Sequence, residues 1–179
     1  MSLEQFKKSI QKAPVIKKGD YSYIVHPITD GIPEIKPEML KEIISEMKKY
    51  IAKCGPIDKI VTIEAMGIPL ATALSLDMNI PFTIIRKRKY GLPGEICVEQ
   101  KTGYSQSKLY INGLQKGENV VIVDDIISTG GTLRVVLSVL KDVGVNVRGI
   151  IVAVDKGDCL KKIEDEFCVQ IRSAIKIKV

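Results

Sequence analysis

The stretch Val120–Thr132 reads VVIVDDIISTGGT and is the most informative segment of the chain. A short run of β-branched residues leads into two adjacent carboxylates, Asp124 and Asp125, and a turn of hydroxyls and glycines follows. Leu133 then opens an apolar stripe with helical spacing, which closes at Gly144. The segment therefore predicts a buried strand, a polar turn and an amphipathic helix in direct succession.

The same alternation of strands and helices extends along the chain. Short apolar runs at 58–63, 81–85 and 147–154 predict further strands, and the segments 37–53 and 67–76 predict helices. Strands that alternate with helices form parallel sheets covered on both faces. We therefore expect an α/β fold with a parallel, Rossmann-like sheet flanked by helices, and a ligand beyond the carboxyl ends of the strands.

Three segments depart from this alternation. Residues 1–35 and the part after Lys156 are expected to form a small hood over the sheet edge, around a core at about 36–156. Together they would make one domain of residues 1–179. The polar segment 86–107 is long for a connection. Its parts 96–100 and 108–111 can pair, so we expect a β-hairpin that acts as a mobile flap.

The composition is that of an ordinary globular protein. The chain has 179 residues, of which 45% are hydrophobic and 27% are charged. No apolar run approaches the roughly 18 residues that span a bilayer, and the N-terminus lacks a signal-peptide core. We therefore expect a cytoplasmic protein that has no membrane partner. The four cysteines form no CxxC pair, so reduced thiols are expected and a zinc site is not.

The formal net charge of +6 suits an anionic ligand. It suits many lysine-rich proteins with solvated surfaces equally well. Nucleic-acid binding has little support, because no dense basic run is interleaved with aromatic residues.

The turn after the two acids has the composition of a phosphate-binding loop. A helix N-terminus presents free N–H groups and a partial positive charge, glycines allow close approach, and hydroxyls add donors. Neither GxxxxGK[ST] nor GxGxxG is present, so the loop is not of the kind that binds nucleoside triphosphates or dinucleotides. The residues of this loop are Ser128, Thr129, Gly130, Gly131 and Thr132.

The two adjacent acids need a separate explanation. Asp124 and Asp125 can accept hydrogen bonds from the vicinal hydroxyls of a ribose while the loop holds its 5-phosphate, and a magnesium ion can lie near them. The alternative is a solvated strand end followed by an ordinary helix N-cap. Capping accounts for Ser128 or Thr129 but not for the paired acids.

At this point a family resemblance emerges. VVIVDDIISTGGT resembles the phosphoribosyl-pyrophosphate (PRPP) motif of the type I phosphoribosyltransferases. IVTIEAMGI at 60–68 resembles the pyrophosphate loop of that family, and IIRKRKYGLPGE at 84–95 resembles the start of its flexible loop. The resemblance covers about 59–156. It points to the purine branch that contains adenine and xanthine phosphoribosyltransferases, near the archaeal hypoxanthine/guanine enzymes.

The resemblance implies a role for each matching segment. Asp124 and Asp125 would hold the ribose hydroxyls, and residues 128–132 the 5-phosphate. Mg²⁺ would be held mainly by PRPP, with Asp124 or Asp125 as an optional protein contact. The pyrophosphate would be wrapped by backbone N–H groups, often next to a cis peptide, and neutralised by two basic side chains. The residues in question are Glu64, Ala65, Met66 and Gly67 for the wrapping and Arg86 and Lys87 for the charge.

Tyr104 resembles the tyrosine of the closing flap, and a homodimer is expected. Simpler interpretations stay open for several residues. Arg86 and Lys87 can be solvated basic residues, and Glu64 can be a surface carboxylate. Tyr104 can serve only to pack a lid. His26, the only histidine, lies in the hood, where a lone histidine is more often structural than functional.

The preferred base depends on a few positions. Gly103 stands where adenine enzymes usually carry glutamate, and Met66 where they commonly carry arginine. Ser128 stands where many hypoxanthine/guanine enzymes carry aspartate, so the proton-transfer group stays open. Lys156, which follows the last predicted strand, can donate to O6 of a 6-oxopurine, or it can be a surface lysine.

These features predict an enzyme of purine salvage. It would transfer the 5-phosphoribosyl group from PRPP to hypoxanthine or guanine and form IMP or GMP and pyrophosphate. Adenine or xanthine are the alternative bases. A regulatory protein that senses PRPP or purines is the alternative from another class.

Overall fold

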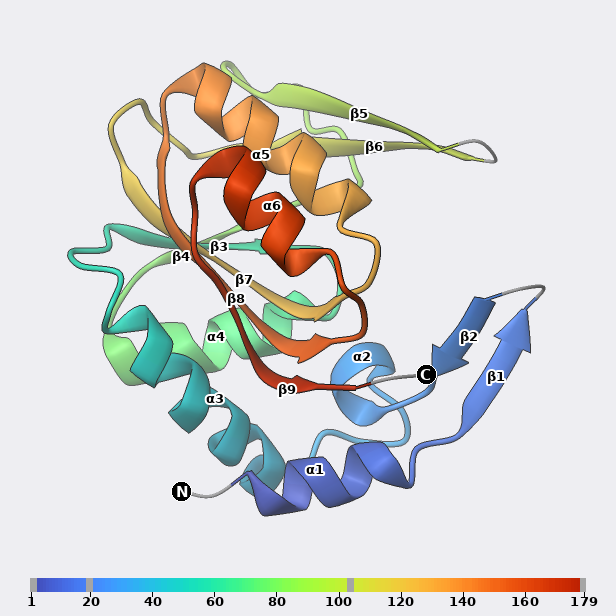
Figure 1. Cartoon of the computed structure of the whole chain (residues 1–179). Coiled ribbons are helices and arrows are strands. Elements are labelled where there is room, and N and C mark those ends of the chain that lie inside the picture. Colours follow the sequence, from blue (N-terminus) through green and yellow to red (C-terminus); the bar gives the residue numbers. More distant parts are fainter. Residues whose placement is uncertain (1–2, 19–20, 103–104, 178–179) are drawn as a thin grey trace.

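A five-stranded parallel sheet forms the centre of the molecule (Figure 1). The computed structural model describes residues 3–18, 21–102 and 105–177. The strand order is β4-β3-β7-β8-β9, and all four pairings are parallel. The strands are β3 (Lys59–Ile63), β4 (Phe82–Ile85), β7 (Asn119–Ile127), β8 (Asn146–Asp155) and β9 (Ile171–Lys176). The predicted α/β fold is confirmed.

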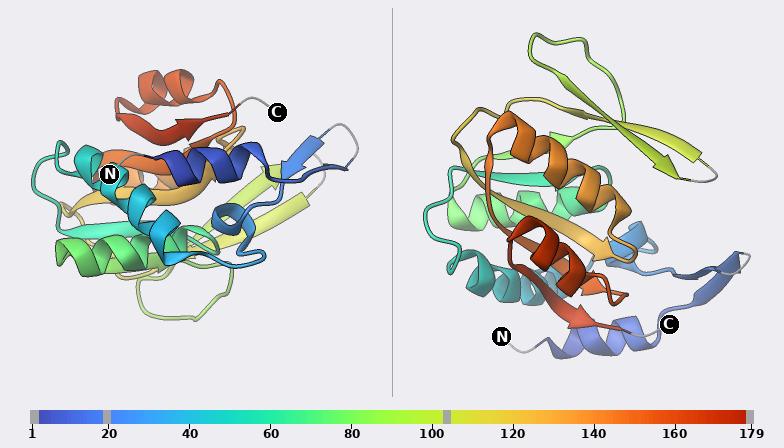
Figure 2. Two further views of the ribbon diagram at one scale, coloured as in Figure 1. Left: turned by 90° about the horizontal axis from the view of Figure 1, so that it is seen from below. Right: turned by 45° about the horizontal axis from the view of Figure 1, so that its top comes forward.

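Helices cover both faces of the sheet. α3 (Pro37–Ile51) and α4 (Gly67–Met78) pack on one face, and α5 (Gly131–Val143) and α6 (Leu160–Phe167) pack on the other (Figures 1 and 2). α5 ends at Gly144, which adopts the left-handed conformation with φ of 80°. The helices predicted for 37–53 and 67–76, and the helical stripe that closes at Gly144, are confirmed.

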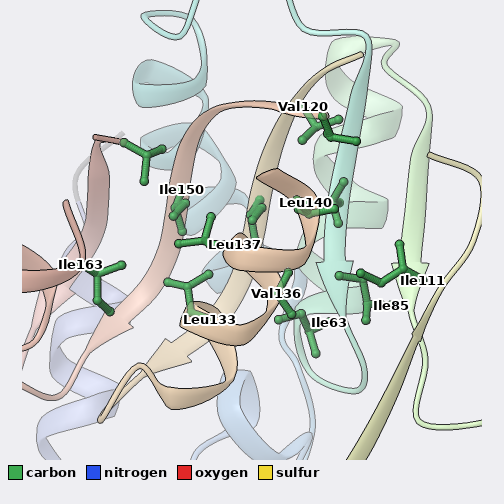
Figure 3. Packing of buried hydrophobic residues seen from close by; sticks show 14 of the residues in the cluster. Ile63, Ile85, Ile111, Val120, Leu133, Val136, Leu137, Leu140, Ile150 and Ile163 are labelled. Atoms are coloured by element: carbon green, nitrogen blue, oxygen red, sulfur yellow. The ribbon is translucent and has the colours of Figure 1, made fainter. Parts of the chain in front are cut away.

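The central strand β7 shows why both faces need a cover. Val120 and Ile122 are fully buried in the cluster that α5 and α6 join, whereas Val121 and Val123 are fully buried in the cluster of α3 and α4. Alternate residues of a strand point to opposite faces, so a continuous apolar run requires two cores. Figure 3 shows the α5 side chains that pack on the first face, namely Leu133, Val136, Leu137 and Leu140.

The prediction that the chain after Lys156 leaves the alternating pattern is wrong. α6 crosses over the sheet, and β9 then pairs parallel to β8 as the fifth strand, with Ile150 opposite Ile171. The core sheet therefore extends to Lys176 and does not end near residue 156. The signal was weak because β9 is an edge strand, and its sequence IRSAIK lacks the apolar run of the inner strands.

The N-terminal part packs beside this core. α1 (Glu4–Gln11) buries Phe6 and Ile10 in the cluster of α3 and α4. A two-stranded hairpin of β1 (Val15–Lys18) and β2 (Tyr21–Ile24) leads into the short helix α2 (Pro27–Asp30). In Figure 1 this hairpin extends toward the side at which the central strands end.

His26 has a structural role in this N-terminal part. It is 1% exposed, and its Nδ1 accepts a hydrogen bond from the Ile28 N–H at 3.1 Å, which caps α2. Nε2 lies 2.9 Å from Ser9 Oγ and therefore carries the proton. Burial lowers the pKa of His26, and nearby Asp30 opposes this only in part. The ring is thus neutral and fully engaged, in agreement with the structural interpretation of a lone histidine.

The predicted flap is a hairpin of β5 (Ile96–Thr102) and β6 (Ser105–Ile111). Its base joins the end of β4, because Arg86 and Tyr110 exchange two backbone hydrogen bonds of 3.0 and 2.7 Å. Val98, Leu109 and Ile111 are buried in the α5 cluster, while the hairpin projects from the body in Figure 2. The hairpin is confirmed. Its mobility stays a prediction, and positions 103 and 104 lie outside the described residues.

Hydrogen exchange tests the mobility of this hairpin. Without ligand, amides of the segment 89–107 beyond the packed base should exchange quickly, because this connection is long, polar and contains several glycines. The buried base around Val98 and Leu109 should exchange slowly. PRPP with magnesium should slow exchange in the outer part. Equal exchange there with and without PRPP would contradict a closing flap.

Candidate active site

A cleft of about 400 Å³ lies at the carboxyl ends of β3 and β7, next to the start of α5. It brings together nine of the residues predicted from the sequence. These are Glu64, Lys87, Asp124, Asp125, Ser128, Thr129, Gly130, Gly131 and Thr132. Apolar residues of the sheet and of α5 form the rest of the wall, among them Ile122, Leu133 and Val152.

The sequence suggested that the two acids lie at the end of a strand. In the structure they lie inside β7, which continues beyond them. β7 continues to Ile127 because its pairing with β8 continues, with Asp124 opposite Val152 and Ile127 opposite Asp155. The apolar residues Ile126 and Ile127 were the available signal for this longer strand. The carboxylates are therefore held by a central strand of the sheet and not by a loop.

Burial is the main electrostatic feature of this acid pair. Asp125 is 9% exposed, and burial, followed by the charge of Asp124, raises its pKa to about 9. Burial also raises the pKa of Asp124 to about 6, although it is opposed by hydrogen bonds from Asp125 and by the charge of Lys87. Asp124 Oδ1 accepts a hydrogen bond from the Asp125 N–H at 3.0 Å. Two like charges this close cannot both ionise easily, so the pair retains one proton near neutral pH.

The loop predicted to bind phosphate lies at the start of α5. Gly130 is the N-cap residue, with φ of 72°, and has no side chain with which to cap the helix. Thr129 Oγ1 lies 3.5 Å from the Gly131 N–H. The 13-residue helix adds a partial positive charge at this end. The loop thus combines backbone donors, hydroxyls and a positive helix end, which is the arrangement that binds phosphate.

The C-terminal segment supports this loop from behind, which the sequence analysis missed. The Cys159 thiol donates to the carbonyl oxygen of Ser128 at 3.0 Å. Arg134 Nη1 donates to the carbonyl oxygen of Thr129 at 3.2 Å, and Arg134 Nε pairs with Glu166 at 2.8 Å. The amphipathic spacing of Leu160, Ile163 and Phe167 was the signal that could have revealed α6.

Gly157 makes the closest contact with the loop. A Cβ at this position would lie 2.4 Å from the carbonyl oxygen of Ser128. Such a distance requires a backbone shift, because the clashing atom belongs to the main chain. The loop and the segment after β8 are therefore packed against each other without spare room.

The predicted pyrophosphate loop follows β3. The Glu64–Ala65 peptide is cis, as the family resemblance implies. Glu64 Oε2 lies 2.8 Å from Arg86 Nε and accepts a hydrogen bond from the Lys87 N–H at 3.1 Å. Glu64 is therefore not a free surface carboxylate, because it links the end of β3 to the end of β4.

Ala65, Met66 and Gly67 complete this loop at the start of α4. Ala65 is exposed, and the end of the Met66 side chain lies 3.6 Å from the point where a Cβ of Gly31 would stand. Gly67 opens α4 and packs tightly, since a Cβ there would lie 2.2 Å from Thr62 Oγ1 and 2.7 Å from Asp124 Oδ1. The absence of a side chain at Gly67 lets α4 begin directly beside the acid pair.

Lys156 lies outside the lining of the cleft, as do Ala65, Met66, Gly67 and Arg86. Lys156 follows β8 and donates its backbone N–H to Ile127 at 2.9 Å. Its ammonium nitrogen lies 5.8 Å from the ring centroid of Tyr23, which belongs to β2. Lys156 therefore faces the N-terminal hairpin at the carboxyl end of the sheet. Tyr104, like Gly103, lies outside the described residues.

Comparisons with known proteins identify the family of the chain. A family model described as "Phosphoribosyl transferase domain" matches residues 34–178. The hypoxanthine/guanine phosphoribosyltransferase of Methanocaldococcus infernus is 50% identical over 179 residues, which cover 100% of this chain and 96% of that relative. The corresponding protein of Methanothermus fervidus is 48% identical over 177 residues, covering 99% and 93% of the two chains.

Solved structures show the same fold. The adenine phosphoribosyltransferase of Saccharomyces cerevisiae has a TM-score of 0.77 at 19% identity, with 97% of this chain and 98% of that chain covered. That of Thermoanaerobacter pseudethanolicus has a TM-score of 0.73 at 23% identity, with 98% and 100% covered. At these identities the likeness concerns the fold alone.

The chain therefore belongs to the phosphoribosyltransferase family, and the resemblance inferred from the sequence is confirmed. It is a purine phosphoribosyltransferase, an enzyme that uses PRPP and a purine base. No helix in the described part of the chain is both long and apolar enough to cross a membrane.

The support of the phosphate loop can be tested with Gly157→Ala. The added methyl group must displace Ser128, so the KM for PRPP should rise about tenfold or more, while kcat at saturating PRPP changes less. The control is Gly149→Ala, whose Cβ would meet Cys54 Sγ at 2.6 Å, far from the loop. The control should lose stability but keep its KM. An unchanged KM in Gly157→Ala would contradict the tight packing.

The acid pair also predicts an unusual pH dependence of stability. Because folding raises both pKa values, the folded protein binds more protons than the unfolded chain from about pH 4 to pH 9. The free energy of unfolding should therefore fall as the pH rises through this window. Asp125→Asn removes this effect, so at pH 8 the variant should be at least about 1 kcal/mol more stable, or roughly 2–4 °C in Tm.

Thermal unfolding followed by circular dichroism from pH 4 to pH 9 measures the difference. Toward pH 4 the gain should become small, because Asp125 is then protonated in the folded state and about half protonated in the unfolded chain. The matched control is the exposed Asp142→Asn on α5, whose Tm difference should stay flat with pH. If the variant is no more stable than the wild type at pH 8, folding does not raise the pKa of Asp125 and the prediction is wrong.

Proposed function

We propose that the protein transfers the 5-phosphoribosyl group of PRPP to hypoxanthine or guanine and forms IMP or GMP and pyrophosphate. The observation that carries this proposal is the identity of about half of all residues, over nearly the whole chain, with hypoxanthine/guanine phosphoribosyltransferases. The adenine enzymes that share the fold are far more distant, at 19% and 23% identity.

In this proposal different walls of the cleft bind different parts of PRPP. Asp124 and Asp125 accept hydrogen bonds from the two ribose hydroxyls, and the start of α5 binds the 5-phosphate. Both groups line the same cleft, which supports the assignment. The ribose donors also replace the water that burial removes from the carboxylates. A rigid strand and a buttressed loop would thus fix the sugar on two sides.

The reaction forms a bond between a purine nitrogen and the anomeric carbon as the bond to pyrophosphate breaks. Positive charge develops on the ribose ring and negative charge on the leaving group. Arg86 and Lys87 lie at the end of β4 beside the Glu64 loop. Glu64 already neutralises part of the charge of Arg86, so Lys87, which lines the cleft, would provide the main uncompensated charge for pyrophosphate.

Mg²⁺ fits this site only as a partner of the substrate. The described residues contain no group of three His, Cys, Asp or Glu side chains able to hold a metal ion. The ion would therefore be bound mainly by PRPP oxygens, with Asp124 or Asp125 as its protein contact. Bound there, it would stabilise the charge that develops on the pyrophosphate.

The hairpin of β5 and β6 would close over the bound substrates. Exclusion of water protects a reactive ribose centre from hydrolysis, and closing flaps serve this purpose in many enzymes. In this proposal Tyr104 belongs to the closing part. Its contribution would appear as a lower kcat in Tyr104→Ala than in Tyr104→Phe.

Lys156 is the proposed base-binding residue. Its ammonium stands near the Tyr23 ring at the carboxyl end of the sheet, between the N-terminal hairpin and β7. A fixed cationic donor suits the O6 acceptor of hypoxanthine, guanine or xanthine. Adenine carries an amino donor at this position, so the ammonium of Lys156 would face a second donor and make no hydrogen bond to the base.

We also propose that the protein is a cytoplasmic homodimer. Tyr90 and Leu92 are 48% and 55% exposed and line an open hollow of about 350 Å³ beside the edge strand β4. A second copy of the chain would cover this apolar edge. Light scattering should then give about twice the chain mass of 19.8 kDa. A monomeric mass would refute the dimer.

One assay tests the central proposal. The protein is incubated with PRPP, magnesium and each of hypoxanthine, guanine, xanthine and adenine in turn, and pyrophosphate and the nucleotide are measured. Hypoxanthine and guanine should be converted far better than adenine. Chelation of magnesium should abolish turnover. Binding of PRPP without turnover of any purine would indicate a sensor, and a preference for adenine would refute the proposed base.

Lys156→Ala tests the base-binding role. The lost hydrogen bond to O6 should raise the KM for hypoxanthine by about 5- to 150-fold, corresponding to roughly 1–3 kcal/mol. The KM for PRPP should hardly change, because a separate loop holds the sugar phosphate. The matched control is Lys161→Ala, which removes an exposed lysine paired with Asp165 on α6. Unchanged hypoxanthine kinetics in Lys156→Ala would indicate that residues of the N-terminal hairpin, and not Lys156, select the base.

A further inference from the structure

Thr62 carries a buried hydroxyl whose presence the fold alone does not explain. It lies in the centre of β3 and is 0% exposed, between the buried residues Val61 and Ile63. Among the described residues, Oγ1 of Thr62 has no hydrogen-bond partner. A buried unpartnered hydroxyl destabilises a fold, whereas valine has the same shape without this cost. The position would therefore favour valine if packing were its only task.

The group next to this hydroxyl is the carboxylate of Asp124. A Cβ on Gly67 would lie 2.2 Å from Thr62 Oγ1 and 2.7 Å from Asp124 Oδ1, so both oxygens border the same small space. The pairing of β3 with β7 sets Thr62 opposite Val123, the residue before Asp124. Any side chain at position 67 would clash with both oxygens, so only glycine fits at this place.

The surroundings of Asp124 oppose its negative charge. Asp125 follows it on β7, and Glu64 lines the same cleft from the end of β3. Lys87, from the end of β4, is the cation that favours the charged form, and burial raises the pKa of Asp124. Its hydrogen bonds, within the described part of the chain, come from Asp125: the backbone N–H donates to Oδ1, and the side chain makes a further bond. A donor from outside the acid pair would favour the ionised carboxylate more.

We propose that Thr62 is a positioning residue whose hydroxyl donates to Asp124 Oδ1 when PRPP is bound, and so turns the carboxylate toward the ribose hydroxyls. The inference rests on the proposed function, because the ribose is what Asp124 receives there. In the free protein the hydroxyl is held ready at a cost in stability. In the complex it completes the set of donors around the carboxylate.

The test compares Thr62→Val, which keeps the shape, with Thr62→Ser, which keeps the hydroxyl. Thr62→Val should keep or raise the Tm, while kcat/KM for PRPP falls about tenfold at pH 7. The acidic limb of the pH profile of kcat, which reports the enzyme–substrate complex, should move about one unit toward higher pH, since a donor to the carboxylate is lost there. Thr62→Ser should restore both the activity and the limb. The KM for the base at saturating PRPP should not change.

The matched control is Thr83→Val on the neighbouring strand β4, whose Oγ1 donates to the carbonyl oxygen of Asn112 at 3.2 Å, away from the acid pair. This control should leave the pH profile in place. A wild-type pH profile and kcat/KM in Thr62→Val would overturn the inference, as would a failure of serine to rescue.

Calorimetric titration with PRPP and magnesium separates this inference from the proposed function. If no purine is turned over but PRPP binds, the proposed reaction is refuted, and a weaker PRPP affinity in Thr62→Val still supports the role of the hydroxyl. An equal affinity in the two proteins overturns that role. If the wild type does not bind PRPP at all, both proposals are refuted.

Discussion

Two adjacent carboxylates in the central strand of the sheet, one buried and one half-buried, are the constraint around which the site is organised. Asp124 and Asp125 lie within β7, which pairs with β8 in one register from Val121 to Ile127, so the backbone holds both side chains rigidly. This arrangement costs stability in the free protein, because burial and mutual repulsion raise both pKa values. Such a cost is typical of a functional site, where groups are prepared for a ligand and not for the fold.

Other parts of the molecule are adapted to this strand. Gly67 lets α4 begin against the acid pair, and the Glu64–Arg86 ion pair joins the ends of β3 and β4 beside it. On the other side of the cleft, α5 starts where β7 ends. Its loop is supported by the Cys159 thiol and by Gly157. The cleft is thus bounded by secondary-structure elements, and the hairpin of β5 and β6 projects from the body.

The support of the phosphate loop gives the C-terminal segment a second task. β9 completes the sheet, and the same segment holds the carbonyl group of Ser128 through Cys159. Glu166 on α6 also pairs with Arg134 of α5, which binds the carbonyl oxygen of Thr129. A helix N-terminus binds an anion well only if the loop before it is held in a fixed position. The edge of the fold therefore contributes directly to the precision of the site.

The sequence by itself determined the α/β fold, the five-residue phosphate loop and the paired acids, because each depends on a local pattern. β7 and α5 are adjacent in the chain, so VVIVDDIISTGGT contains the strand, the acids and the loop in one segment. The tertiary structure alone decided how distant segments meet. The place of β9 in the sheet depends on pairing with β8, and its own residues carry only a weak edge-strand signal.

The same distinction applies to individual side chains. The structural role of His26 is visible only in the tertiary structure, which places Ser9 and Ile28 at its two ring nitrogens. Thr62 looks like an ordinary β-branched strand residue in the sequence. Its unpartnered hydroxyl beside Asp124 follows from the packing of α4 on two strands, which are joined in the chain by more than fifty residues. Local patterns specify elements, whereas burial and partnership arise only when the elements pack.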